Sequence, residues 1–191
     1  MTGNVRIIGG LLRGRKLQVM SLPGLRPSGD RSRETLFNWI GPSIQGLRCL
    51  DLFAGTGVLG LEALSRGARS VTLVERSPQA VEKIRDQIES WPGRERIDLV
   101  AADAFRWLPR RSDPFDLVFI DPPHGLGMQI QALMGLVEND RLALDGRVCV
   151  EYAARESWAG DHQNWLEAQF DCLKSARFGG VELSLLQPST L

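Results

Sequence analysis

Residues 50–67 read LDLFAGTGVLGLEALSRG, and this stretch decides the fold. Its first residues end an apolar run that predicts a buried strand over 48–53, and the residues after them predict a helix near 57–66. Gly55, Gly57 and Gly60 follow the spacing G-x-G-x-x-G. Glycine at a turn from strand to helix lets a ligand approach the backbone closely, which is typical of nucleotide sites in doubly wound α/β folds. By itself the motif fits a dinucleotide as well as any other nucleotide.

The alternation of strand and helix continues toward the C-terminus. Strand-like runs cover 70–75, 97–101, 115–120 and 147–152, with helical patterns near 78–90, 104–108 and 128–138. Near-continuous apolar strands separated by helices predict right-handed βαβ units and a parallel sheet covered on both faces. After a helix near 161–169, two strand-like runs are joined by Gly179-Gly180, which predicts an antiparallel hairpin. We therefore expect a doubly wound α/β fold with a mostly parallel sheet of seven strands.

Carboxylates stand at or near the ends of the first three core strands. Asp51, beside the glycine loop, would repel a pyrophosphate but attract an amino group and a sulfonium, both of which S-adenosylmethionine carries. Glu75 is placed to accept hydrogen bonds from ribose hydroxyls, and Asp103 lies where an adenine amino group would sit. Two of these residues also have a structural interpretation, because Asp51 could cap the loop through backbone N–H groups and Asp103 could cap the helix that follows it.

Residues 119–124 read FIDPPH and end the fourth core strand. Proline cannot continue a sheet ladder, so Pro122 and Pro123 predict a stiff, extended segment at the strand tip. In a doubly wound sheet this strand lies beside the first, so FIDPPH faces the glycine loop across the crevice. The Asp121 carboxylate and the Pro122 carbonyl could accept both hydrogens of a base amine and aim its lone pair at a methyl sulfonium, while His124 could stack on the base.

The first 40 residues are basic although the whole chain is formally neutral. Runs at 5–10 and 13–19 predict a small hairpin, and 25–40 lead from a loop into a helix with Asp30 as its N-cap. Only Asp30 and Glu34 oppose seven basic residues, a local net charge of +5: Arg6, Arg13, Arg15, Lys16, Arg26, Arg31 and Arg33. Such an arm favours a nucleic-acid partner, with the first four on phosphates and the other three at the mouth of the crevice. Any one arginine could instead be solvated or paired internally.

The glycine loop and the Asp-Pro-Pro motif together resemble the class I methyltransferases that modify amino nitrogens. RIIGGLLRGRKLQV, LRPSGDRSRETLFNWI, LDLFAGTGVLGLEALSRGA, VERS and FIDPPH, in this order, further resemble the RsmD family, which methylates N2 of guanine 966 in bacterial 16S ribosomal RNA. The resemblance is strong over about residues 5–125 and looser beyond. It departs at His124, where the signature usually has phenylalanine or tyrosine, so stacking would be weaker and protonation would lower activity at mildly acidic pH.

The resemblance implies a Rossmann-like class I fold, with a basic RNA-binding extension over residues 1–40 and a methyltransferase domain over residues 41–191. It implies catalytic contacts from Asp121, Pro122, Pro123 and His124, and no metal. The implied S-adenosylmethionine site consists of Asp51, Phe53, Ala54, Gly55, Thr56, Gly57, Glu75, Arg76, Asp103 and Ala104. The expected partner is 16S ribosomal RNA, free or within an assembling small subunit, for a cytoplasmic and monomeric protein with no membrane segment.

Three other functions stay open. Another amino methyltransferase on the same frame could modify adenine N6 in DNA or RNA, or protein glutamine. The DNA enzymes usually carry a larger target-recognition segment, and the glutamine enzymes usually have Asn at the position of Asp121. A dinucleotide-dependent oxidoreductase would have no use for FIDPPH, and a non-catalytic RNA-binding protein would bind RNA without methyl transfer.

Overall fold

The computed structural model describes residues 3–19, 30–110, 113–123, 127–154 and 161–189. The strands are β1 (Asn4–Arg6), β2 (Lys16–Gln18), β3 (Arg48–Asp51), β4 (Ser70–Glu75), β5 (Ile97–Ala101), β6 (Phe115–Ile120), β7 (Leu142–Ala153), β8 (Phe170–Phe178) and β9 (Val181–Pro188). The helices are α1 (Asp30–Ile40), α2 (Val58–Ser65), α3 (Pro78–Ile88), α4 (Ala104–Trp107), α5 (Met128–Glu138) and α6 (Asp161–Gln169), with the short 3₁₀ segments η1 (Gly41–Ile44) and η2 (Arg94–Arg96).

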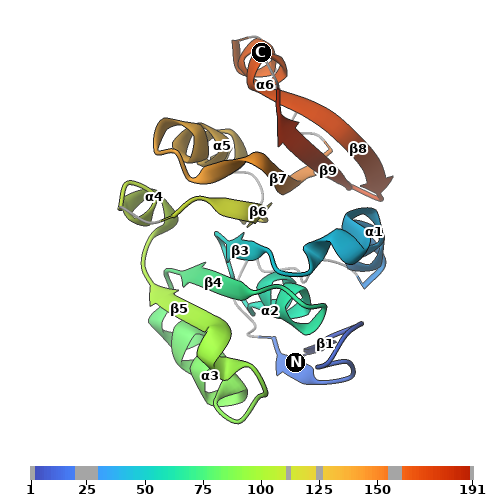
Figure 1. Ribbon diagram of the computed structural model, residues 1–191, viewed down its shortest axis with the longest axis vertical. Coiled ribbons are helices and arrows are strands. Elements are labelled where there is room, and N and C mark those ends of the chain that lie inside the picture. The colour runs from blue at the N-terminus through green and yellow to red at the C-terminus, as the bar shows by residue number, and fades with distance from the viewer. Residues whose placement is uncertain (1–2, 20–29, 111–112, 124–126, 155–160, 190–191) are drawn as a thin grey trace.

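Seven strands form one sheet in the order β5-β4-β3-β6-β7-β9-β8, and β1 and β2 form a separate antiparallel pair (Figure 1). The five strands from β5 to β7 are parallel, and β9 and β8 extend the sheet as an antiparallel pair. The winding direction reverses between β3 and β6, because β4 and β5 lie on one side of β3 and all later strands lie on the other. Ligands of doubly wound sheets bind at such a reversal, outside the carboxyl ends of the strands.

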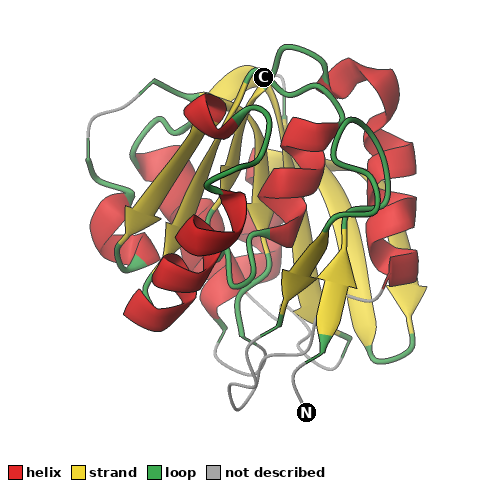
Figure 2. Ribbon diagram, turned by 90° about the horizontal axis from the view of Figure 1, so that it is seen from below, coloured by secondary structure: helices red, strands yellow, loops and turns green. Residues whose placement is uncertain are grey.

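Helices cover both faces of the sheet (Figure 2). On one face the hairpin, α1, α2 and α3 pack with sheet residues such as Cys49, Leu117 and Phe119. On the other face α4, α5 and α6 pack with the alternating sheet residues, such as Leu50 and Val118. Because successive strand residues point to opposite faces, a continuous apolar strand supplies both layers of the core, as the sequence predicted.

The N-terminal hairpin shares the core of the main body. Val5, Ile7, Leu12 and Leu17 are all buried, and they belong to the same apolar cluster as α2 and the first face of the sheet. The outward residues of β1 and β2 are polar, in keeping with the alternation of a strand that has one buried face. The hairpin therefore has a fixed position against α2.

The predicted seven-stranded fold is confirmed, while several element boundaries differ from those expected, including those of β3 and β7. β4, β5 and β6 have the predicted bounds, and so do α5 and α6. β3 ends at Asp51, two residues earlier than expected, where the chain turns into the glycine loop. β7 begins at Leu142 instead of 147, because Leu142 pairs with Phe115 before the register shifts to Leu117 and Arg147. Between those pairs β7 has four residues where β6 has one, so β7 bulges there.

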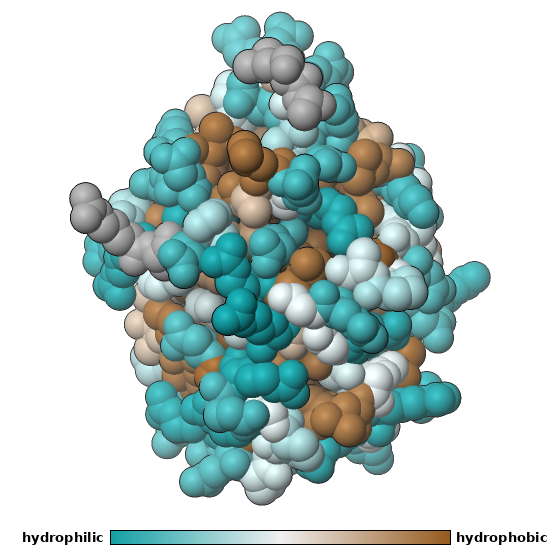
Figure 3. Space-filling view, in the orientation of Figure 1, coloured by the Kyte–Doolittle hydropathy of each residue, from teal (hydrophilic) through white to brown (hydrophobic). Residues whose placement is uncertain are grey.

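The surface mixes polar and apolar residues. On the face shown in Figure 3, hydrophobic residues form separate patches between hydrophilic ones. Among the described residues, the large apolar side chains that are exposed come from separate parts of the fold: Leu11, Val137, Leu144 and Leu173. None of the helices described is long and apolar enough to cross a membrane.

Candidate active site

The carboxyl ends of four neighbouring strands bring together the acidic residues that the sequence singled out. Asp51 ends β3, Glu75 ends β4, Asp103 follows β5 by two residues, and Asp121 follows β6 directly. These strands are adjacent in the sheet, so the four carboxylates line one edge at the point where the winding reverses. The glycine loop and Asp121 therefore follow neighbouring strands, as predicted.

Glycines shape the turn from β3 into α2. Gly57 is the N-cap of α2 and has a left-handed backbone, with φ of 75°. This conformation is disfavoured for residues with a Cβ. A Cβ at Gly60 would lie 2.4 Å from Leu73 Cδ2 and 2.7 Å from Val71 Cγ2, so this glycine lets α2 lie close against β4. Gly57 thus serves the turn into α2, and Gly60 serves helix–sheet packing, which is the role that the G-x-G-x-x-G pattern assigns to its third glycine.

Asp51 is buried, with 1% of its surface exposed. Its Oδ2 accepts a hydrogen bond from the backbone N–H of Gly60 at 3.0 Å, so it ties the strand end to the first turns of α2. Burial raises the pKa of Asp51 to about 7, the Gly60 N–H opposes this rise, and the negative charges of Asp121 and Glu75 add to it. The capping role considered for Asp51 is thus present, and the proximity of the other carboxylates makes the spot attractive to a cation.

Glu75 holds the glycine loop from the next strand. Its Oε2 accepts from the backbone N–H of Gly55 at 2.8 Å, and its Oε1 accepts from that of Ser77 at 2.7 Å. Each carboxylate oxygen can accept a second hydrogen bond. Arg76, which follows Glu75, is exposed. Glu75 therefore fixes the loop and can still accept hydrogens from a ligand's hydroxyls.

Asp103 caps α4, as its structural interpretation predicted. Its Oδ1 accepts from the backbone N–H groups of Phe105 at 3.1 Å and Arg106 at 3.2 Å, so both of these bonds use the same oxygen. Beside it, the rings of Phe53 and Phe105 meet edge to face with centroids 5.9 Å apart. Both rings are half-buried. Phe105 was missed by the sequence reasoning; its only signal was its place two residues after Asp103.

Asp121 and Pro122 form the tip of β6. Asp121 is half-buried, Pro122 is buried and Pro123 is exposed. The charge of Asp121 reaches Asp51, since it contributes to the raised pKa of that residue. The tip of β6 thus faces the end of β3, while His124, the predicted stacking residue, lies outside the described residues.

The predicted RNA-binding residues do not share one environment. Arg6, Arg13, Lys16 and Arg31 are exposed, whereas Arg26 lies outside the described part of the chain. Arg15 is half-buried, and its guanidinium carbon lies 5.2 Å from the ring centroid of Trp91.

Arg33 differs from the expectation most strongly, because it is 1% exposed. It donates from Nη2 to Asp30 Oδ1 at 2.6 Å and from Nη1 to the backbone oxygen of Arg6 at 3.0 Å. Asp30, expected to cap α1, is its first residue and pairs with this guanidinium. Arg33 thus joins α1 to β1, which is the internal pairing that the sequence left open.

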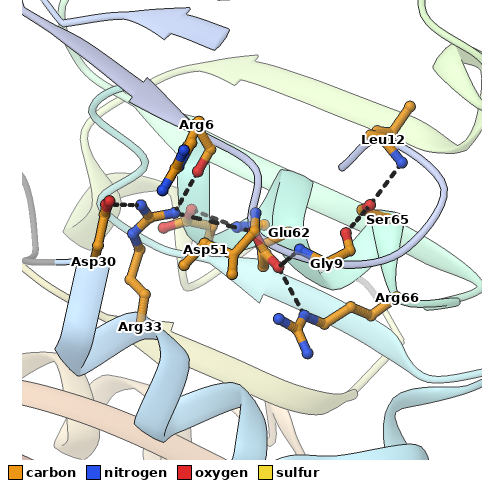
Figure 4. A network of polar contacts seen from close by, with 11 residues as sticks. Arg6, Gly9, Leu12, Asp30, Arg33, Asp51, Glu62, Ser65 and Arg66 are labelled. Carbon is orange, nitrogen blue, oxygen red and sulfur yellow. Dashed lines mark hydrogen bonds and ion pairs between the residues drawn. The ribbon is translucent and has the colours of Figure 1, made fainter. Parts of the chain in front are cut away.

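A buried carboxylate that the sequence reasoning missed fastens the hairpin to α2 (Figure 4). Glu62 is fully buried and accepts from the backbone N–H groups of Ile8 at 2.7 Å and Gly9 at 2.8 Å. Arg66 Nε donates to it at 2.7 Å, and Arg33 Nη1 lies 4.0 Å away. Two cations and two backbone donors thus satisfy Glu62. The glutamate looked like an ordinary helix residue because, apart from Arg66 at the end of its own helix, its partners lie far away in the sequence.

The strand order, the glycine loop after β3 and the acidic edge define a Rossmann-like class I methyltransferase fold. The model of the family described as conserved hypothetical protein 95 matches residues 5–187. The chain belongs to this family, the RsmD family that the motifs predicted.

Known relatives agree with this membership. Ribosomal RNA small subunit methyltransferase D from Escherichia coli K12 is 41% identical over 165 residues, which are 86% of this chain and 82% of the relative. The protein of the same name from Haemophilus influenzae is 42% identical over 152 residues, 78% of this chain and 79% of the relative. The solved structure of yhhF from Escherichia coli superposes with a TM-score of 0.84 at 36% identity, covering 99% of this chain and all of that one.

Proposed function

We propose that the protein transfers a methyl group from S-adenosylmethionine to N2 of a guanine in 16S ribosomal RNA, by family resemblance guanine 966. Its relatives named ribosomal RNA methyltransferases support the enzyme class and the RNA substrate. The observation that carries the choice of an amino nitrogen is the Asp121-Pro122 tip of β6, which faces the glycine loop beside β3.

The residues at the acidic edge suit S-adenosylmethionine better than a dinucleotide. Asp51, with two further carboxylates in electrostatic reach, favours a positively charged ligand and disfavours a pyrophosphate. Glu75 can accept hydrogens from ribose hydroxyls, and Asp103 from an adenine amino group, with Phe53 and Phe105 as apolar neighbours. When bound, S-adenosylmethionine supplies a methyl group on a sulfonium sulfur, which is already a strong electrophile.

The residues of the protein have to orient the base amine, because its lone pair is delocalised into the ring and makes it a weak nucleophile. The Asp121 carboxylate and the Pro122 carbonyl accept its two hydrogens, and the adjacent prolines keep these acceptors at a fixed spacing. The lone pair then points toward the glycine loop. The amine nitrogen forms a bond to the methyl carbon as the carbon–sulfur bond breaks and its electron pair stays on sulfur. The cationic amine finally loses a proton to Asp121 or to water.

The hairpin would hold the RNA. Arg6 and Lys16 are directly opposite each other in the β1–β2 register, and both are exposed. Their positive charges repel each other, and a bound phosphate would offset this repulsion. With residues 1–40 as the RNA-binding extension, the target nucleotide would reach the methyltransferase domain over 41–191. An assembling small subunit is the substrate form we propose, met in the cytoplasm by a monomeric enzyme.

Calorimetric titration with S-adenosylmethionine and with NAD, followed by methyl transfer to 16S ribosomal RNA, tests this function. We expect micromolar binding of the first ligand only, and transfer of one methyl group per RNA. Binding of NAD would favour the oxidoreductase alternative. Binding of S-adenosylmethionine with methylation of adenine instead of guanine would favour the adenine-N6 alternative, and RNA binding without transfer would favour a non-catalytic protein.

A further inference from the structure

A second carboxylate lies beside Asp121 on the adjacent strand. β6 and β7 are parallel, and Ile120 pairs with Val150. The next residues along the two strands are Asp121 and Glu151. Since neighbouring strands lie about 4.8 Å apart and side chains alternate between faces, these two side chains stand next to each other on the same face of the sheet. This is the face covered by α1 and α2, because Phe119 and Cys149, two residues earlier on each strand, both belong to that layer of the core.

Both carboxylates line one small recess, and an arginine lines it too. Asp121 and Glu151 form one side of the recess, and Ser32 and Arg33 of α1 form another. Glu151 is 9% exposed and Arg33 is 1% exposed. The Nε–H of Arg33 is buried and has no hydrogen-bond partner among the residues that the structure describes. A buried donor left without a partner is unfavourable by about 1–3 kcal/mol, which is one sign of a site that a ligand completes.

We propose that Glu151 is a specificity-determining residue that accepts the N1–H of the target guanine. This inference rests on the proposed function, in which Asp121 and Pro122 already hold the neighbouring 2-amino group. On the Watson–Crick edge of guanine, N1–H lies directly beside that amino group, as Glu151 lies directly beside Asp121. A carboxylate is an acceptor only, so it matches N1–H.

The buried donor completes the match to guanine. Beyond N1–H the same edge carries the acceptor O6, and Arg33 Nε–H can donate to it. Three acceptors (Asp121, Pro122 and Glu151) and one donor (Arg33) therefore face the three hydrogens of the 2-amino group and N1 and the one acceptor O6. Adenine presents an unprotonated N1, which would bring a lone pair against the Glu151 carboxylate. This repulsion between two hydrogen-bond acceptors disfavours adenine, whereas guanine brings a hydrogen to the same carboxylate.

The test compares two RNA fragments that carry the same sequence around the target nucleotide. One has guanine there and the other has 2-aminopurine, which keeps the 2-amino group but has no hydrogen on N1 and no O6. The proteins are the wild type, Glu151→Gln, and the matched control Glu182→Gln. Glu182 is a carboxylate of the same sheet that pairs in register with Tyr152 on β7 and does not line the recess. Methyl-transfer kcat/KM is measured for each combination, with S-adenosylmethionine affinity and Tm as checks on folding.

We expect the wild type and Glu182→Gln to prefer guanine over 2-aminopurine by about 100-fold or more. Glu151→Gln should lower kcat/KM on guanine by about 10- to 100-fold, because a neutral amide oxygen is a weaker acceptor for N1–H than a carboxylate. It should not lower kcat/KM on 2-aminopurine, because the glutamine amide can turn its NH₂ toward an unprotonated N1. Equal losses on both RNAs, or no loss on guanine, would overturn the role of Glu151.

Two further results distinguish a failure of the proposed function from a failure of this inference. A wild type that transfers no methyl group to the guanine RNA would refute the proposed function itself, and the inference with it. If Glu151→Gln does not fold, the wild-type protein alone tests the inference. A wild-type preference for guanine over 2-aminopurine of less than about threefold would mean that the site recognises neither N1–H nor O6, and would refute the inference.

Discussion

Single residues at the acidic edge combine structural and chemical roles. Asp51 holds α2 through Gly60, and Glu75 holds the glycine loop through Gly55, so the carboxylates that would meet the methyl donor also build its site. Spacing in the sequence was enough to find Asp51, Glu75, Asp103 and Asp121, because each ends a recognisable strand.

Spacing could not find the roles of Arg33 and Glu62. The backbone groups of the hairpin that they bind are distant in sequence, and burial rather than residue type decides what they do. Arg33 illustrates the difficulty, since it was one of seven basic residues in a basic arm and only the packing of α1 against β1 removes it from the surface.

Replacing Asp51 by Asn should change how stability depends on pH. The pKa of Asp51 is raised from 3.8 to about 7 in the folded protein, so the stability it contributes is fully present below pH 4 and is lost as pH rises through about 7. Asn keeps an oxygen for the Gly60 N–H and carries no charge. We expect equal free energies of unfolding near pH 4, and Asp51→Asn more stable by the order of a few kcal/mol at pH 8, in urea unfolding at several pH values.

The same variant should lose affinity for S-adenosylmethionine at pH 8, because the negative charge that attracts the donor is gone. Stability curves that stay parallel from pH 4 to 8 would show that Asp51 is not buried as a titrating group.

At the level of elements, α2 links the candidate active site to the hairpin. Its N-terminus follows the glycine loop, while Glu62 and Ser65 bind the backbone of residues 8–12. The turn after β1 is close to α2, with Leu11 N–H donating to the Ser65 carbonyl at 2.8 Å. Movement of the hairpin would therefore act directly on the helix that begins at the site.

The elements themselves were largely predictable because their patterns are local. Alternating apolar runs and glycine turns gave β4, β5 and β6 within their observed bounds. The start of β7 was missed because the pairing of Leu142 with Phe115 is separated from the rest of the strand by a bulge, which no local pattern marks.

A pair of glycine substitutions tests the contact between hairpin and helix. Gly10 and Gly14 both have a left-handed backbone, with φ of 76° and 85°. A Cβ at Gly10 would lie 1.9 Å from the Ser65 carbonyl oxygen, whereas one at Gly14 would meet nothing within 4 Å. We expect Gly14→Ala to lower the free energy of unfolding by about 1–2 kcal/mol and Gly10→Ala by about 3–5 kcal/mol. Equal losses in urea unfolding would mean that the turn does not rest on α2.

Removing the carboxylate of Glu62 should also lower the free energy of unfolding strongly. Glu62→Ala leaves two backbone N–H groups and the guanidiniums of Arg33 and Arg66 without their acceptor, so we expect a loss of about 3–5 kcal/mol. Glu82→Ala, on the exposed side of α3, is the matched control and should change stability by less than about 0.5 kcal/mol. A loss for Glu62→Ala no larger than that of the control would contradict the network in Figure 4.

Across the whole molecule, charge is separated although the total is zero. Of the basic residues in the first 40 positions, those that the structure describes lie on the hairpin and α1, and carboxylates gather at the strand ends. This division suits a protein that holds a polyanion at its surface and a cation in its crevice. The sequence predicted the division, but the described residues narrow the exposed part of the basic arm to Arg6, Arg13, Lys16 and Arg31.

Replacing Arg6, Arg13 and Lys16 by Gln together should weaken RNA binding and reduce its salt dependence. Each lost phosphate contact on single-stranded RNA lowers the slope of log affinity against log salt by about 0.7, so three contacts predict a decrease of about 2. Replacing the exposed Arg85, Arg110 and Lys174 by Gln removes the same charge from other elements and should leave the slope nearly unchanged. Equal slopes for the two triple variants would remove the hairpin from the interface.

The central claim is that Asp121, at the tip of β6, holds the amine of the target base toward a methyl donor bound beside β3. Mass spectrometry of 16S ribosomal RNA from a strain that lacks this gene, complemented with wild type or with Asp121→Ala, tests it most directly. We predict N2-methylguanine at one position with the wild type and none with Asp121→Ala, while purified Asp121→Ala still binds S-adenosylmethionine. Full methylation by Asp121→Ala at the same position would contradict the claim.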